Sequence, residues 1–103
     1  MPNTPDFDAD VLTESDVKLE KPKLFKVLLH NDDFTTMEFV VYVLKAVFHR
    51  TDIEAFSVMM KVHNEGVGVA GIYTYEIAQM KAEKAINLAR REEFPFLCTI
   101  EEE

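Results

Sequence analysis

The fold of this chain is decided by residues 24–48, which read LFKVLLHNDDFTTMEFVVYVLKAVF. The first six of these residues are rich in apolar side chains and precede turn-forming residues, which is typical of a strand. Asn, Asp and Asp at 31–33 favour a turn, because such side chains hydrogen-bond to nearby backbone amides. Thr35 followed by Glu38 fits a capping box, which predicts a helix over about 37–49.

This predicted helix is apolar on almost every side. Its apolar residues are Met37, Phe39, Val40, Val41, Tyr42, Val43, Leu44, Ala46, Val47 and Phe48. A helix of that kind needs two apolar neighbours. In a small domain one face can pack on the core, and we expect the other face to line a groove for a ligand.

The next predicted helix begins at a second capping box. Thr51 is followed by Glu54, and Gly66 fits the end of a helix that runs to about Asn64. The apolar residues of this helix fall on two adjacent faces. One face consists of Ile53, Phe56 and Met60, and the other of Met59, Val62 and His63.

The last third of the chain predicts a strand over 67–73, a helix over about 75–92 that Thr74 can cap, and a strand over 96–100. Four alanines share one face of that helix and allow close packing on a sheet: Ala78, Ala82, Ala85 and Ala89. The sequence therefore predicts an α+β fold, a single small domain of order β-α-α-β-α-β in which a three-stranded antiparallel sheet packs on three helices. We expect this core domain over residues 22–103, after a flexible acidic N-terminal extension over 1–21.

Composition limits the classes of function. The chain has 103 residues and a formal net charge of -8, and its excess of acids lies in residues 1–20 and 101–103. The segment between them is balanced, which argues against a nucleic-acid partner. Cys98 is the single cysteine, which excludes an intrachain disulfide and favours a reducing compartment. No apolar run approaches the roughly 18 residues that a membrane helix needs, so we expect no membrane partner.

The strongest candidate site is the turn before the first helix. Asp32 and Asp33 form an anionic spot that exceeds what a helix cap requires and suits an ammonium group. His63 alone is more typical of a structural residue, but its neutral ring can share a ligand amine with the aspartates. Four apolar residues are each typical of plain core, yet as a set they also suit a pocket for large side chains. They are Met37, Val40, Met59 and Val62.

One alternative function is a small metal-dependent hydrolase that uses His30, Asp32, Asp33 and His63. The sequence contains no HxxxH, HxxE or CxxC spacing, which argues against a metal site. Nucleophilic catalysis has less support, because Cys98 lies in a predicted strand and no glycine-rich phosphate loop is present. A third candidate is an acidic inhibitor that acts through its tails. We expect no catalytic residues, no bound metal and no cofactor.

Four motifs, taken in order, resemble the ClpS adaptor family. Residues 25–40, FKVLLHNDDFTTMEFV, are similar to a family signature that reads approximately YKVxLxNDDxTPMEFV. The further motifs are residues 59–63 with Gly66, residues 76–81 and residues 95–99. The resemblance covers about residues 22–102, and four motifs in the right order are far more specific than any one of them.

The resemblance implies an adaptor and not an enzyme. ClpS adaptors bind the free α-amino group and the large hydrophobic first side chain (Phe, Tyr, Trp or Leu) of N-degron substrates. They deliver these substrates to a ClpA-type AAA+ unfoldase of the ClpP protease. We therefore expect a monomer in the bacterial cytoplasm whose partners are the N-terminal domain of that unfoldase and N-degron proteins, with no cofactor.

The resemblance also assigns roles to residues. Binding of the α-amino group falls to Asn31, Asp33 and His63, with Asp32 and Thr35 holding the start of the substrate backbone. The walls of the side-chain pocket are Leu29, Met37, Val40, Met59, Val62 and Phe96, and Met37 screens out β-branched first residues. Glu76 and Lys81 match unfoldase-facing positions, and residues 1–20 match the extension that the unfoldase engages.

Three residues depart from the family pattern. Thr36 stands in place of a proline, His30 in place of an apolar residue, and Phe96 in place of a leucine. A protonated His30 would repel the substrate ammonium, and Phe96 would narrow the pocket. We expect these differences to affect the breadth of first-residue specificity and not the binding mode.

Overall fold

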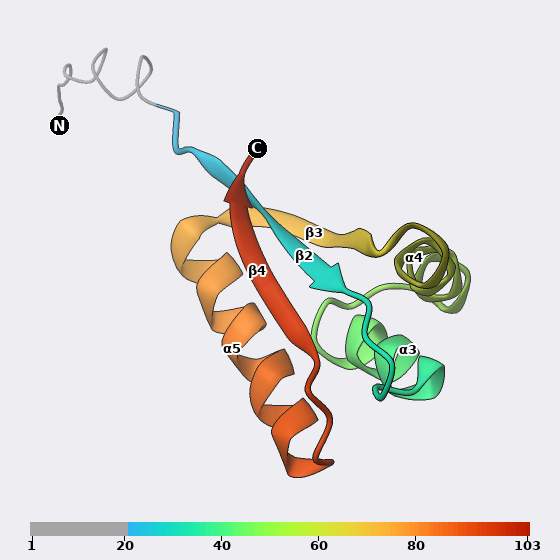
Figure 1. The fold of residues 1–103 in the computed structure, drawn as a ribbon. Coiled ribbons are helices and arrows are strands. Elements are labelled where there is room, and N and C mark those ends of the chain that lie inside the picture. Colours follow the sequence, from blue (N-terminus) through green and yellow to red (C-terminus); the bar gives the residue numbers. More distant parts are fainter. Residues whose placement is uncertain (1–20) are drawn as a thin grey trace, which may run out of the picture.

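The computed structural model describes residues 21–103, whose elements are labelled in Figure 1. In chain order they are β2 (Leu24–His30), α3 (Met37–Ala46), α4 (Asp52–Glu65), β3 (Val67–Thr74), α5 (Tyr75–Arg91) and β4 (Leu97–Glu102). The predicted α+β class and the order of its elements are confirmed. The extension predicted over residues 1–21 lies outside the described residues except for Lys21, so it stays a prediction.

The three strands form one antiparallel sheet in the order β3-β2-β4. Figure 1 shows α5 lying along the sheet, whereas α3 and α4 lie beside the end of β2 that leads into α3. Side chains alternate along β2: Val27 and Leu29 are fully buried, while Leu28 and His30 are half-buried. One face of the sheet therefore carries the core, and the other face is open.

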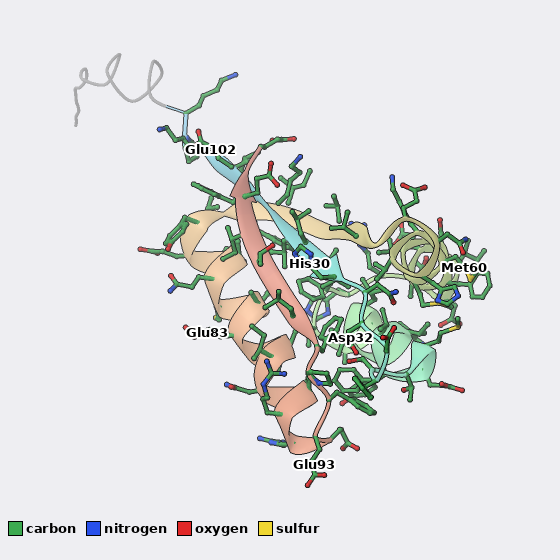
Figure 2. The ribbon with its side chains drawn as sticks, in the orientation of Figure 1. His30, Asp32, Met60, Glu83, Glu93 and Glu102 are labelled. Atoms are coloured by element: carbon green, nitrogen blue, oxygen red, sulfur yellow. The ribbon has the colours of Figure 1, made fainter. Side chains whose placement is uncertain are left out.

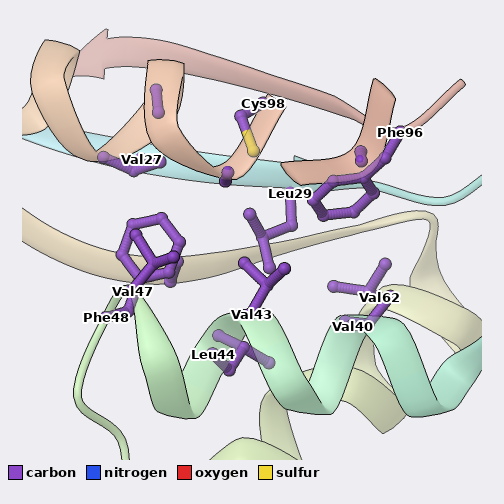
Figure 3. Packing of buried hydrophobic residues seen from close by; sticks show 14 of the residues in the cluster. Val27, Leu29, Val40, Val43, Leu44, Val47, Phe48, Val62, Phe96 and Cys98 are labelled. Atoms are coloured by element: carbon purple, nitrogen blue, oxygen red, sulfur yellow. The ribbon is translucent and has the colours of Figure 1, made fainter. Parts of the chain in front are cut away.

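The core lies between the sheet and the helices. All four alanines of the predicted small-residue face are buried, and α5 contacts each of the three strands. The buried residues of α3 are Phe39, Val40, Val43 and Leu44, and those of α4 are Ala55, Met59 and Val62. Figure 3 shows Leu29 from β2 reaching toward Val43 on α3, so β2 and α3 share one apolar layer.

Capping begins and ends α4 as predicted. Both hydrogen bonds of the capping box between Thr51 and Glu54 are present. Gly66 ends the helix with a φ of 91°, in the left-handed region that favours glycine. The turn after α4, and with it the position of His63 in the last turn of the helix, is fixed by local sequence.

The start of α3 differs from the prediction by one residue. Thr36 is the cap, because its Oγ1 accepts a hydrogen bond from the Phe39 amide at 3.1 Å. The capping box predicted at Thr35 is wrong, since the Thr35 hydroxyl donates to Asp32 instead. Capping by the Thr74 side chain at α5 is also wrong, because that side chain makes no cap hydrogen bond.

The length of α3 also differs, because the helix ends at Ala46 and not near His49. His49 adopts a φ of 57°, which a continuing helix does not allow. Within residues 21–103, no helix has both the length and the apolar character needed to cross a membrane.

Only one of the two apolar faces of α4 packs on the core. Met59 and Val62 are buried, whereas Ile53 is 82% exposed and Phe56 is 58% exposed. Periodicity alone finds both faces, but the orientation of the helix depends on what the sheet and α3 offer it. On the other face, only Met60 packs in part against the core, so Ile53 and Phe56 have no role in core packing.

Candidate functional site

The loop between β2 and α3 holds the polar side of the site. Asn31 begins this loop, and its backbone N–H donates a hydrogen bond to the carbonyl oxygen of Gly66 at 2.9 Å. That bond ties the loop to the turn that follows α4. The acidic loop and the end of α4 that carries His63 are thereby held side by side.

Asp32 closes the loop on itself. Its Oδ1 accepts hydrogen bonds from the amides of Phe34 at 2.8 Å and Thr35 at 2.7 Å, and its Oδ2 accepts one from the Thr35 hydroxyl at 2.8 Å. Burial opposes charge on this carboxyl, but these hydrogen bonds and the positive charge of Arg90 outweigh it, so the pKa of Asp32 lies below its ordinary value. The Asp32 carboxylate is therefore committed to the shape of the loop.

Asp33 and His63 are in a different situation. Within residues 21–103, neither the Asp33 carboxylate nor the His63 ring takes part in a hydrogen bond or an ion pair with another protein group. Both residues line the same cavity. Their acceptor atoms therefore remain available to a ligand.

This cavity joins the polar loop to an apolar wall and has a volume of about 250 Å³. Its polar lining consists of Asn31, Asp32, Asp33, Thr35 and His63, and its apolar lining of Met37, Val40, Met59 and Val62. The volume lies just below the range of about 300–1,000 Å³ typical of sites for drug-sized ligands, so it suits one large side chain. An anionic rim beside an apolar recess suits a ligand with an amine next to an apolar group.

Two residues predicted to wall the pocket lie elsewhere. Leu29 and Phe96 have no exposed surface and do not line the cavity. Leu29 pairs with Cys98 on the core side of the sheet, and the Phe96 ring packs edge-on against Phe39. Figure 3 places both in the core near Val40 and Val62, so they support the pocket wall from behind.

His30 does not join the site. Its side chain lies on the open face of the sheet, where Nε2 is 2.7 Å from Oγ1 of Thr99. Figure 2 shows it on β2, apart from Asp32 in the loop. The four residues of the metal-hydrolase alternative are thus not brought together, and residues 21–103 contain no group of three or more His, Cys, Asp or Glu placed to hold a metal ion.

The one thiol of the chain is unsuited to nucleophilic chemistry. Cys98 is buried on the core side of β4. Burial raises the pKa of the Cys98 thiol to about 12, so the reactive thiolate is scarce at neutral pH.

The two residues matched to unfoldase-facing positions have unequal environments. Glu76 is exposed in the first turn of α5. Lys81 is half-buried, because its Nζ donates a hydrogen bond to the carbonyl oxygen of Val47 at 2.8 Å and lies 5.4 Å from the centre of the Tyr73 ring. Lys81 therefore ties α5 to the end of α3, and its ammonium group already interacts with Val47 and Tyr73 within the fold.

One residue that supports the site has no place in the sequence-based prediction. Arg90 donates hydrogen bonds to the carbonyl oxygens of Phe94 at 2.7 Å and Phe96 at 3.1 Å, and its charge favours ionised Asp32. A basic residue in the last turn of a helix is the signal for such bonds, but it does not identify their partners.

Loss of the Asp32 hydrogen bonds is expected to destabilise the loop. Asp32→Ala should lower the free energy of unfolding by about 1 kcal/mol, whereas Asp32→Asn keeps an acceptor for the two amides. Since the folded-state pKa lies below the unfolded value, the charge contributes stability above that value, and the contribution is lost as pH falls through the folded pKa.

Urea denaturation measures this effect. The stability difference between the wild type and Asp32→Asn should shrink as pH is lowered from about 7 toward about 3. A difference that stays constant over this range would show that the Asp32 charge does not stabilise the loop.

With this geometry in hand, comparison with known proteins identifies the family. Residues 20–99 match the family of the ATP-dependent Clp protease adaptor protein ClpS. The chain belongs to the ClpS family. ClpS proteins are Clp protease adaptors, so the chain is an adaptor of that protease and not an enzyme.

Relatives cover most of the chain. The ClpS of Desulfatibacillum aliphaticivorans is 55% identical over 94 residues, which are 91% of this chain and 90% of that protein. The ClpS of Nitratidesulfovibrio vulgaris strain DP4 is 50% identical over 101 residues, which are 98% of this chain and 95% of that protein. The solved structure of Agrobacterium tumefaciens ClpS2 bound to L-phenylalaninamide has a TM-score of 0.78 and 43% identity, and covers 81% of this chain and 100% of that chain.

Proposed function

We propose that this ClpS adaptor binds N-degron substrates by their first residue. Asn31, Asp33 and His63 hold the free α-amino group, and the large hydrophobic side chain of Phe, Tyr, Trp or Leu enters the cavity. Its walls are Met37, Val40, Met59 and Val62. Asp32 and Thr35 shape the loop and contact the start of the substrate backbone.

The observation that carries this proposal is the meeting of unpartnered acceptors and apolar walls in one cavity of about 250 Å³. An ammonium group has three donors, which the Asn31 amide oxygen, the Asp33 carboxylate and the neutral His63 ring can satisfy together. The binding of L-phenylalaninamide by the Agrobacterium protein supports the same chemistry, because that ligand joins a free amine to a phenyl side chain.

The energetics of this binding suit an adaptor. Burying a Phe or Leu side chain stabilises the complex by about 1.5–3 kcal/mol. Each charge-assisted hydrogen bond to the ammonium adds about 1.5–3 kcal/mol before the entropy of association is subtracted. The total agrees with dissociation constants on the order of micromolar, which permit release to the protease.

Terminal recognition follows from the same groups. An internal Phe has no free amine, so its binding would leave the acceptors of the cavity desolvated and unpaired. The adaptor is thus selective for the start of a chain, even though Phe and Leu are common within chains.

Delivery forms the second part of the proposal. The adaptor passes its substrates to the N-terminal domain of a ClpA-type AAA+ unfoldase in the bacterial cytoplasm, and it acts as a monomer. Glu76, exposed on α5, offers a charge to that partner, with Lys81 in the next turn of the same helix. Residues 1–20 form the extension that the unfoldase engages.

Fluorescence anisotropy with a panel of peptides that differ only in the first residue tests the binding step. Peptides that begin with Phe, Tyr, Trp or Leu are expected to bind at least about tenfold more tightly than a peptide that begins with Ser, because Ser leaves the apolar recess unfilled. The control is an N-acetylated Phe peptide, which should not bind. Equal binding of the acetylated and free peptides would refute recognition of the α-amino group.

A further inference from the structure

The outer face of α4 carries an apolar ridge, formed by Ile53, Phe56 and Met60. Ile53 is 82% exposed and Phe56 is 58% exposed, while Met60 is half-buried. The buried core residues of α4 are Ala55, Met59 and Val62, and of the three ridge residues only Met60 packs in part against the core. Core packing therefore does not account for Ile53 and Phe56. Figure 2 shows Met60 on α4, on the side of the molecule away from α5.

This ridge is continuous with the cavity. Phe56 and His63 are seven residues apart on α4, so they lie on the same side of the helix, two turns and about 10 Å from one another. Met60 stands between them, one turn from His63, which itself lines the cavity. The ridge therefore leads away from the amine-binding end of the site along α4.

α3 lies beside α4. Lys45 near the end of α3 pairs with Asp52 at the start of α4 at 2.6 Å, and Met37 at the start of α3 shares the cavity with His63. The two helices are thus antiparallel neighbours.

We propose that this ridge binds the side chain of the third residue of the same substrate, and that the adaptor favours N-degrons with a large apolar residue there. In an extended peptide the first and third side chains point to the same side. The first and third Cα atoms of an extended peptide are about 7 Å apart, so a first residue held at His63 places its third side chain over α4 between Met60 and Phe56. The inference rests on the proposed function, since the first residue must occupy the cavity.

The experiment uses two fluorescent peptides that begin Phe-Ser-Leu and Phe-Ser-Ser and are otherwise identical. Leu at the third position should tighten binding to the wild type about three- to tenfold, the range that a partly buried side chain supports. Phe56→Ser should abolish this gain and leave the affinity for Phe-Ser-Ser unchanged. The matched control Met80→Ser, which removes a 60% exposed side chain on α5, should retain the gain.

The outcomes separate this inference from the proposed function. If neither peptide binds the wild type, first-residue recognition fails and the inference fails with it. If both bind with equal affinity, only the ridge proposal is overturned. A third peptide that begins Phe-Leu-Ser carries the leucine at the second position. If it binds more tightly than Phe-Ser-Ser while Phe-Ser-Leu does not, the assignment to the third residue is overturned. Sedimentation equilibrium that shows a dimer lost in Phe56→Ser, without a peptide effect, would assign the ridge to a second copy of the chain.

Discussion

Asp33→Ala is expected to weaken the binding of a peptide that begins with Phe by about 100-fold, which corresponds to roughly 2.8 kcal/mol. The Asp33 carboxylate lines the cavity and has no protein partner within residues 21–103, so its charge is available to the substrate ammonium. Truncating one member of a desolvated charge pair costs about 2–5 kcal/mol, partly because the other charge is left unpaired. Fluorescence anisotropy measures the loss.

The neighbouring aspartate supplies the control for this substitution. Asp32→Ala removes the hydrogen bonds to Phe34 and Thr35 and should lower both stability and affinity. Asp33→Ala should leave the midpoint of thermal unfolding unchanged and lower affinity alone. If Asp33→Ala binds as tightly as the wild type, Asp33 does not hold the α-amino group. If Asp33→Ala unfolds, the role of Asp33 is structural.

Local signals in the sequence were sufficient for most of the fold. The capping box of Thr51 and Glu54 and the glycine at position 66 bound α4 within a few residues, because their hydrogen bonds involve neighbours along the chain. At α3, two adjacent threonines compete for the same role. The choice of Thr36 depends on Asp32, which engages Thr35, and a capping pattern carries no information on that contact.

The residues that line the cavity have clearer signals in the sequence than the residues that lie behind it. The lining residues come from a short loop and from two helix faces, all of which periodicity and turn chemistry identify. Leu29 and Phe96 lie behind the lining of the cavity, because their position depends on strand register and on packing across the sheet, which sequence spacing does not give. The placement of His30 did have a signal: Val27 and Leu29 point to the core, so the residue after Leu29 must point to the open face.

Contacts over long sequence separations account for the remaining differences. Lys81 was matched to a partner-facing position, yet its ammonium donates to Val47, 34 residues away in sequence. The exposed ridge on α4 is a second case, since Ile53 and Phe56 have the spacing of a core face. In both cases the sequence gives the residue type and helical face correctly, and only the tertiary neighbours decide whether that face meets the core or solvent.

Met37→Ala is expected to admit β-branched first residues. Met37 is the first residue of α3, directly after the Thr36 cap, so its backbone is fixed at the mouth of the cavity. A β-branched side chain is widest next to the backbone, where it would meet the methionine. Such overpacking costs about 1–3 kcal/mol, so the preference for Phe over Ile should fall by about 10- to 100-fold in Met37→Ala.

Competition of Phe and Ile peptides for a labelled probe measures this ratio, and Met37→Leu is the matched control because it nearly conserves volume and should keep the discrimination. Stability should change little, since Met37 is 41% exposed and lies outside the core. The affinity for Phe should fall only a few-fold, because Val40, Met59 and Val62 still form the apolar recess. If the Met37→Ala protein still fails to bind the Ile peptide, another residue must exclude β-branched side chains. The buried side chains of Val40 and Met59, deeper in the recess, would then have that role, and Met37 would only contact the substrate.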